Sequence, residues 1–153
     1  MLALLKKLSK KDLVKLAATR FAYSYIMLSN LLDERCMQGL CKLMIDDKFA
    51  KKKVSRSVQA IEVNNIVFSY AFWQEARTIL KICAPLLKIL RLADREGATM
   101  GLIYELTDRM VEQVQNMQGI ETDRIQEVKD LCIDRWDMLH TPLHVVVYTL
   151  HPA

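Results

Sequence analysis

Residues 70–92 read YAFWQEARTILKICAPLLKILRL, and their apolar side chains recur at spacings of three and four residues. That period places the apolar side chains along one face of an α-helix. The face consists of Phe72, Trp73, Ala76, Ile79, Leu80, Cys83, Leu86, Leu87 and Leu90. Pro85 removes the hydrogen bond to the carbonyl of Lys81, so we expect a kink near it. The sequence therefore predicts one long amphipathic helix from Tyr70 to Leu92.

The same period continues on both sides of this helix. It predicts further helices over residues 2–8, 20–32, 33–44, 100–118, 121–139 and 143–150. Residues 55–68 also follow a helical pattern, but their β-branched content leaves a strand as the alternative. Residues 46–53 are predicted to be a linker, because they consist mainly of charged residues, with two acids at the start and three lysines at the end. The β-branched run at residues 145–147 predicts that the last helix is buried.

Four positions are predicted to end or begin helices. Ser9, followed by Asp12, has the spacing of a helix N-cap, and Thr19 is placed to cap the next helix. Gly119 fits the position that follows a helix C-terminus. Thr141 before Pro142 is a helix start, because proline has no N–H to leave unsatisfied in the first turn.

Composition supports the same fold class over the whole chain. The 153 residues are 52% hydrophobic and 26% charged, with only 4 Gly and 3 Pro. This balance excludes a disordered chain, and no apolar run approaches the length of a membrane span. We therefore predict a single all-α domain over residues 1–153, built as a multi-helix antiparallel bundle.

Positive charge is concentrated in the N-terminal third of the chain. Residues 1–53 hold 12 Lys and Arg against 5 Asp and Glu, whereas residues 54–153 hold 10 against 13. The run Lys51, Lys52 and Lys53 with Arg56 is a candidate nucleic-acid contact, because such side chains neutralise phosphates. A solvated basic loop is the alternative, and no aromatic residues interleave with the run as base stacking would require.

The first 24 residues form a second basic segment. Leucines alternate with Lys6, Lys7, Lys10, Lys11 and Lys15, while Asp12 is the one acid among them. A basic, amphipathic and acid-poor opening is typical of mitochondrial targeting helices. The alternative is an ordinary surface helix, because the segment is rich in Lys rather than Arg and poor in Ser.

The cysteines and histidines give no clear catalytic or metal centre. Cys36, Cys41, Cys83 and Cys132 form no C-x-x-C pair, so we expect free thiols. His140 and His144, with Asp137 or Cys132 nearby, have metal-ligand spacing, but Pro142 between them removes the shared helix face. We therefore expect capping or packing histidines. Cys132 with His140 is the one local nucleophile–base pair, and nothing around it resembles a nucleophile motif.

Several short motifs follow one another along the chain. They are TRFA at residues 19–22, FW at 72–73, PL at 85–86, LRLAD at 90–94, MGLIYE at 100–105, RW at 135–136, PLH at 142–144 and LHP at 150–152. In this order they resemble the central part of the catalytic domain of hAT-type transposases from plants. The resemblance covers essentially the whole chain, although His151 stands where that family commonly has Asn or Asp.

The resemblance implies a fragment, truncated at both ends, of an RNase H-like domain with its helical insertion. In that family two of the three metal-binding acids precede the segment matched by residues 19–22, and the third follows the region where this chain stops. It implies that the catalytic carboxylates, the N-terminal zinc finger and the C-terminal dimerisation region are all missing. No catalytic residue can be transferred to this chain, and two-metal chemistry would have no site.

These observations predict a catalytically inactive, transposase-derived helical protein, without cofactor or metal, that acts by protein–protein interaction or self-association. Truncation would leave apolar helix faces uncovered, which favours association. The predicted core anchors are Phe21, Phe72, Trp73, Leu86, Leu90 and Trp136. The alternatives are a small mitochondrion- or membrane-directed effector, cytotoxic or regulatory, and a residual DNA-binding module. The expected compartment is the nucleus or cytoplasm, with the mitochondrion as the alternative.

Overall fold

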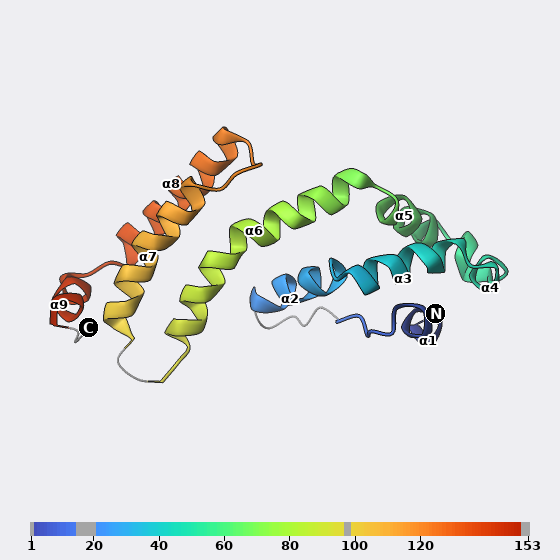
Figure 1. The fold of residues 1–153 in the computed structure, drawn as a ribbon, viewed down its shortest axis with the longest axis horizontal. Coiled ribbons are helices and arrows are strands. Elements are labelled where there is room, and N and C mark those ends of the chain that lie inside the picture. Colours follow the sequence, from blue (N-terminus) through green and yellow to red (C-terminus); the bar gives the residue numbers. More distant parts are fainter. Residues whose placement is uncertain (1, 15–20, 97–98, 151–153) are drawn as a thin grey trace. The chain divides into compact units, whose positions relative to one another are not determined.

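The computed structural model describes residues 2–14, 21–96 and 99–150, without the side chains of Leu2 and Phe21. Over these ranges the chain forms α-helices, one short 3-10 helix and connecting turns, and it contains no strand (Figure 1). The helices are α1 Leu2–Ser9, α2 Phe21–Leu31, α3 Glu34–Ile45, α4 Asp47–Ala50, η1 Lys53–Arg56, α5 Val58–Val67, α6 Tyr70–Ala93, α7 Met100–Gln115, α8 Thr122–Leu139 and α9 Pro142–Leu150. The predicted all-α fold class is confirmed.

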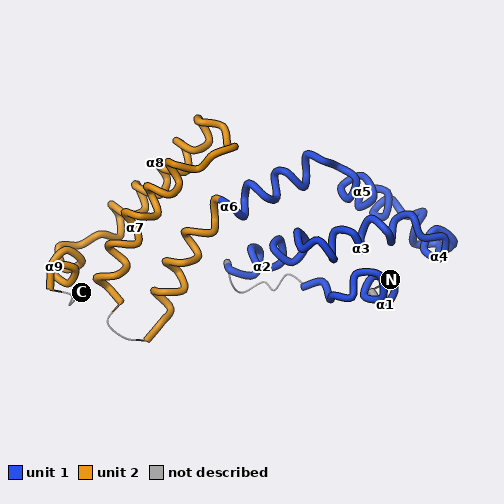
Figure 2. The backbone as a smooth tube through the Cα atoms, viewed as in Figure 1, with its two compact units in different colours: residues 1–81 blue, residues 82–153 orange. Residues whose placement is uncertain are grey.

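The chain divides into two compact units, residues 1–81 and residues 82–153, shown in different colours in Figure 2. The boundary falls inside α6, the long helix that the apolar period predicts. The helix continues through Pro85, and the kink expected there stays a prediction. The single folding domain over residues 1–153 likewise stays a prediction.

Unit 1 is built around α3. Its buried apolar cluster joins one or two residues from each of α1, α3, α4, α5 and α6: Leu5, Leu40, Leu43, Phe49, Val67 and Trp73. The end of α1 lies directly against α3, because a Cβ on Gly39 would stand 2.5 Å from the Cβ of Ser9. Glycine at position 39 therefore allows the two backbones to approach closely.

Unit 2 is built around α7, which packs on both α8 and α9. The buried residues of α7 are Gly101, Thr107, Met110 and Val114, and Cys132 is the buried residue of α8. Thr107 satisfies its hydroxyl group within the helix by donating to the carbonyl of Ile103 at 2.8 Å. These side chains form the interior of the α7–α8–α9 layer.

The predicted core is correct for Trp73 but not for every anchor. Trp73 is buried, whereas Phe72, Leu86 and Trp136 are half-buried. Leu90 is 43% exposed, so its placement in the core is wrong: the apolar stripe of α6 is longer than the surface packed against it. The side chain of Phe21 lies outside the described part of the chain.

The segment predicted as a linker, residues 46–53, contains the helix α4 and the start of η1. The carboxylate of Asp46 caps α4 by accepting hydrogen bonds from the backbone N–H groups of Lys48 and Phe49, and Phe49 anchors the turn in the core. Residues 58–67 form the helix α5 rather than a strand, with Ser57 as N-cap. Asp33 caps α3 in the same way, by accepting from the backbone N–H of Arg35.

Three smaller predictions need correction. Ser9 ends α1 instead of capping a following helix, and its Oγ accepts from the backbone N–H of Lys11. Gly119 adopts a left-handed φ of 77°, but in the turn beyond Asn116, the C-cap of α7. The β-branched residues Val145 and Val146 are exposed, because the outer face of α9, away from α7, is uncovered. Thr19 lies outside the described residues.

Candidate interaction surface

An apolar groove crosses the surface of unit 1. It has a volume of about 430 Å³ and is lined by Met37, Gln38, Cys41, Lys42, Ile45, Val67, Phe68, Tyr70 and Trp73. One wall is a single face of α3, because positions 37, 41 and 45 are each four residues apart. The other wall is the junction between α5 and α6. We call this surface the α3 groove.

The floor of the α3 groove is formed by a buried, hydrogen-bonded tryptophan, while its rim is exposed. Trp73 is only 7% exposed, and its indole N–H donates to the carbonyl of Val67 at 2.8 Å. The ring of Phe72 meets the Trp73 ring edge-on at 5.1 Å between centroids. On the rim, Ile45 and Tyr70 are each 74% exposed. Large apolar side chains standing around an apolar floor are typical of a surface that binds another protein.

A further apolar surface lies on the outer side of α5. Val58, Ile61 and Ile66 are exposed there, on the opposite side of the helix from the buried Val67. The polar side chains of Glu62 and Asn65 are exposed among them, so this side of α5 is mixed rather than continuously apolar. In unit 2, α9 repeats the pattern: it holds no buried residue, and Leu143, Val146 and Leu150 are exposed on one face.

The four residues predicted to contact nucleic acid lie together at the end of α4 and on η1. Lys51, Lys52, Lys53 and Arg56 are all exposed, and the structure gives them no ion pair within the described ranges. Their neighbour Phe49 is buried in the core, so it offers no stacking surface. The contact with nucleic acid stays a prediction.

Two of the lysines in the predicted targeting helix form ion pairs within unit 1. Leu5 buries the apolar side of α1 against α3. Lys6 pairs with Asp12 at 2.7 Å, and Lys11 pairs with Asp33 at the same distance. Lys7 and Lys10 are exposed, and Lys15 lies outside the described residues. Targeting by this helix stays a prediction.

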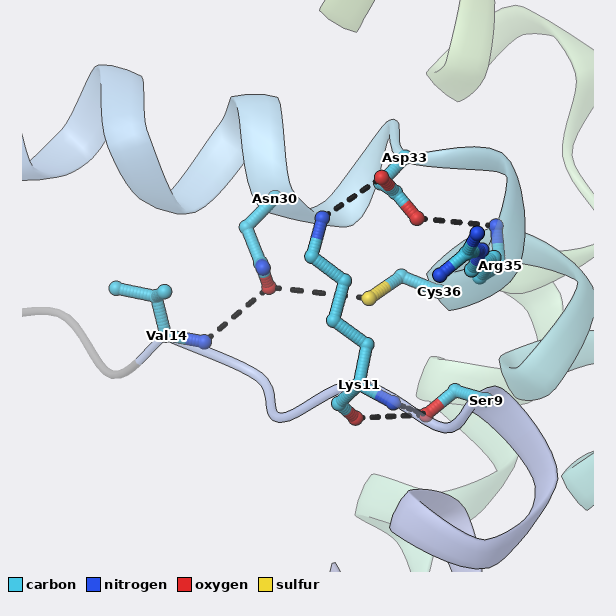
Figure 3. A network of polar contacts seen from close by, with 7 residues as sticks. All are labelled: Ser9, Lys11, Val14, Asn30, Asp33, Arg35 and Cys36. Atoms are coloured by element: carbon cyan, nitrogen blue, oxygen red, sulfur yellow. Dashed lines mark hydrogen bonds and ion pairs between the residues drawn. The ribbon is translucent and has the colours of Figure 1, made fainter.

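Figure 3 shows the polar network around Lys11 and Asp33. Asn30 Oδ1 accepts from the backbone N–H of Val14 at 3.2 Å and from the thiol of Cys36 at 3.9 Å. The Lys11 ammonium lowers the pKa of the Asp33 carboxyl group. Burial raises the pKa of the Cys36 thiol, and the charge of Asp33 adds to the increase. The network joins the segment after α1 to the α2–α3 turn, and a raised pKa disfavours the reactive thiolate form of Cys36.

The histidines belong to a cluster of rings from α7, α8 and α9. Its members are Tyr104, Trp136, His140, His144 and Tyr148. Nδ1 of His144 accepts from the backbone N–H of Thr141 at 3.1 Å, so this histidine helps to cap α9. The predicted capping and packing roles are confirmed for His144 and His140. His151 lies outside the described residues.

The local chemistry gives no support to a nucleophile or metal centre. Burial raises the pKa of the Cys132 thiol, which is the opposite of what activates a cysteine. Across the described ranges, no group of three His, Cys, Asp or Glu side chains is placed to hold a metal ion. Nor is any helix of that part both long and apolar enough to cross a bilayer. The cysteines are free, as the sequence predicts.

Sequence reasoning missed the rim of the α3 groove. Ile45, Phe68 and Tyr70 lie at helix ends, where a periodic pattern gives no indication of which side they face. One sequence feature could have indicated this rim: the helix ends carry more large apolar residues than the predicted apolar faces account for. Met37 and Cys41, which lie in the helix predicted over residues 33–44, also line the groove.

No protein-family model, no curated protein and no solved structure matches this chain. The resemblance to hAT-type transposases therefore rests on the sequence motifs alone and stays a prediction.

Proposed function

We propose that this chain is a non-catalytic helical protein that acts by association with a second copy of itself. The observation that carries the proposal is the α3 groove, which combines an ordered apolar floor with an exposed apolar rim. Leaving such side chains in water is unfavourable, by roughly 25 cal/mol per Å² of apolar surface. A partner that covers the rim removes this cost.

The occupant that fits the α3 groove best is α9 of the second copy. Helices bind in apolar grooves through anchors at positions i, i+3 or i+4, and i+7. Leu143, Val146 and Leu150 have that spacing, and Leu143 and Leu150 are 57% and 76% exposed. No Asp, Glu, Lys or Arg occurs in α9, so its burial desolvates no full charge of these types.

The transposase origin is a second part of this proposal and has a different basis. It is supported by the order of the sequence motifs and by the all-α fold of the described residues. A fragment of a larger catalytic domain would retain helices whose outer faces once packed on other parts of that domain. The uncovered faces of α5 and α9 have the character that such an origin would produce.

The test is a pair of complementary variants. Ile45→Lys alters the groove and leaves α9 intact, whereas Val146→Lys alters α9 and leaves the groove intact. Each variant alone should shift the mass measured by light scattering towards the monomer. An equimolar mixture should regain association, because one intact groove can still meet one intact α9.

Leu131→Lys is the matched control, since it places the same charge at an exposed apolar position of α8 outside both surfaces. It should associate as the unaltered chain does. Equal loss of association in this control, or a mixture that stays monomeric, would show that the groove and α9 are not the contacting surfaces.

A further inference from the structure

A second pocket of unit 1 has a different character from the α3 groove. It lies between the end of α1 and one face of α3, with a volume of about 440 Å³, and it is lined by Leu8, Ser9, Lys10, Arg35, Gln38 and Lys42. Three of these side chains are cations, and no carboxylate is among the lining residues. A concave space surrounded by cations in this way attracts anions.

The walls of the pocket are fixed by backbone packing. Ser9 is buried against Gly39, and its hydroxyl group lies 2.9 Å from the carbonyl of Leu5 and 2.7 Å from that of Lys11. Lys10 follows with a left-handed φ of 55°, and its N–H donates to the carbonyl of Lys6 at 2.9 Å. On α3, positions 35, 38 and 42 share one face of the helix. The pocket is therefore bounded by segments whose backbone is held in place.

The acids closest in sequence are already engaged. Asp33 pairs with Lys11, and Asp12 pairs with Lys6. Glu34 accepts a hydrogen bond from the side chain of Gln38 at 3.0 Å. Within the described part of the chain, neither Lys10 nor Arg35 nor Lys42 has an ion-pair partner. Three like charges thus face one space without neutralisation, and a bound anion would relieve their repulsion.

We propose that this pocket binds a phosphate ester group, carried either by a small soluble molecule or by a lipid headgroup. The guanidinium group of Arg35 can donate two parallel hydrogen bonds to phosphate oxygens, and the ammonium groups of Lys10 and Lys42 supply further charge. The volume lies in the range of small-molecule sites, about 300–1,000 Å³. No aromatic residue lines the pocket, so it provides no stacking surface for nucleic-acid bases.

Isothermal titration of the full chain with inorganic phosphate and pyrophosphate, at constant ionic strength, tests the proposal. The unaltered chain should show saturable binding. Arg35→Gln and Lys10→Gln should each weaken it at least tenfold. These two residues do not line the α3 groove, so both variants should keep the association behaviour of the unaltered chain; Lys42 lines both sites and is left unchanged.

Lys48→Gln and Arg56→Gln are the controls, because each removes one positive charge outside the pocket. They should bind as the unaltered chain does. A control that weakens binding as much as Arg35→Gln, or an unaltered chain that shows no saturation, overturns the proposal.

A second arm identifies the source of the phosphate group. It measures sedimentation with phosphatidylcholine vesicles that contain a phosphatidylinositol phosphate, and with vesicles that lack it. Binding that depends on Arg35 and on the phosphorylated lipid assigns the group to a headgroup. Binding of soluble phosphate alone assigns it to a soluble ester.

Discussion

At the scale of single residues, Gly39 determines how closely α1 approaches α3. A Cβ at this position would lie 2.5 Å from the Cβ and 2.8 Å from the Cα of Ser9, and a backbone atom cannot move aside as a flexible side chain can. We expect Gly39→Ala to lower the free energy of unfolding by about 1–3 kcal/mol, the usual cost of overpacking. Chemical denaturation followed by circular dichroism measures it.

Gln38→Ala is the control for this variant, because it changes an exposed neighbour on the same helix. Its unfolding free energy should stay close to that of the unaltered chain. A Gly39→Ala protein as stable as the Gln38→Ala protein would mean that the end of α1 does not pack on α3 in solution.

The ion pair between Lys11 and Asp33 predicts a pH dependence. The Lys11 ammonium lowers the pKa of Asp33 in the folded chain, so the carboxylate contributes stability above its ordinary pKa. That contribution is lost as the pH falls through the lowered value. Asp33→Asn keeps a side chain that can cap α3 but removes the charge.

We therefore expect Asp33→Asn to be less stable than the unaltered chain at pH 7, and the difference to shrink as the pH falls below the ordinary aspartate range. Urea unfolding of both proteins at pH 7 and at acid pH measures it. A difference that stays constant with pH would show that the charge of Asp33 contributes nothing to folding.

At the scale of elements, the long helix α6 was predictable because its apolar residues keep the helical spacing throughout its 24 residues, which is more than six turns. No competing pattern interrupts this spacing. The short helix α4 was not predictable, since a polar run hides it. Asp46 caps α4 and Phe49 anchors it in the core. Neither role can be read from the local sequence, because both depend on Phe49 packing in the core. Sequence patterns identify faces of helices well, but they do not identify the partner of a face.

The same limit applies to both surfaces of unit 1. The α3 groove joins Met37 and Ile45 to Tyr70 and Trp73, which are far away along the chain. The cationic pocket joins Lys10 to Arg35 and Lys42. No local pattern connects these residues, because their proximity results from the packing of α1, α5 and α6 against α3.

The basic segment of α4 and η1 predicts a specific salt dependence if it contacts nucleic acid. Affinity for duplex DNA should fall as salt rises, and each phosphate contact that is removed should reduce the slope of log K against log salt by about 0.9. Lys52→Gln and Arg56→Gln should lower this slope in fluorescence anisotropy titrations. Lys88→Gln, an exposed lysine of α6, should leave it unchanged. Absent or salt-independent binding would remove the DNA-binding alternative.

At the scale of the whole molecule, the sequence predicts that residues 1–153 unfold as one domain, whereas the two compact units predict separate unfolding. Each unit has buried apolar residues of its own, with Leu43 at 1% exposure in unit 1 and Met110 at 6% in unit 2. Truncating either side chain to Ala should cost about 2–5 kcal/mol. Because each cavity lies within one unit, we expect its effect to be confined to that unit.

Hydrogen exchange followed by mass spectrometry separates the two outcomes, since it reports the local free energy of opening for each helix. Leu43→Ala should speed exchange in α3 and leave α7 protected, and Met110→Ala should do the reverse. If both variants speed exchange equally in both helices, the chain unfolds as one cooperative domain. In that case a partner bound at the α3 groove would also stabilise the α7–α8–α9 layer, because ligand binding stabilises the whole cooperative unit to which its site belongs.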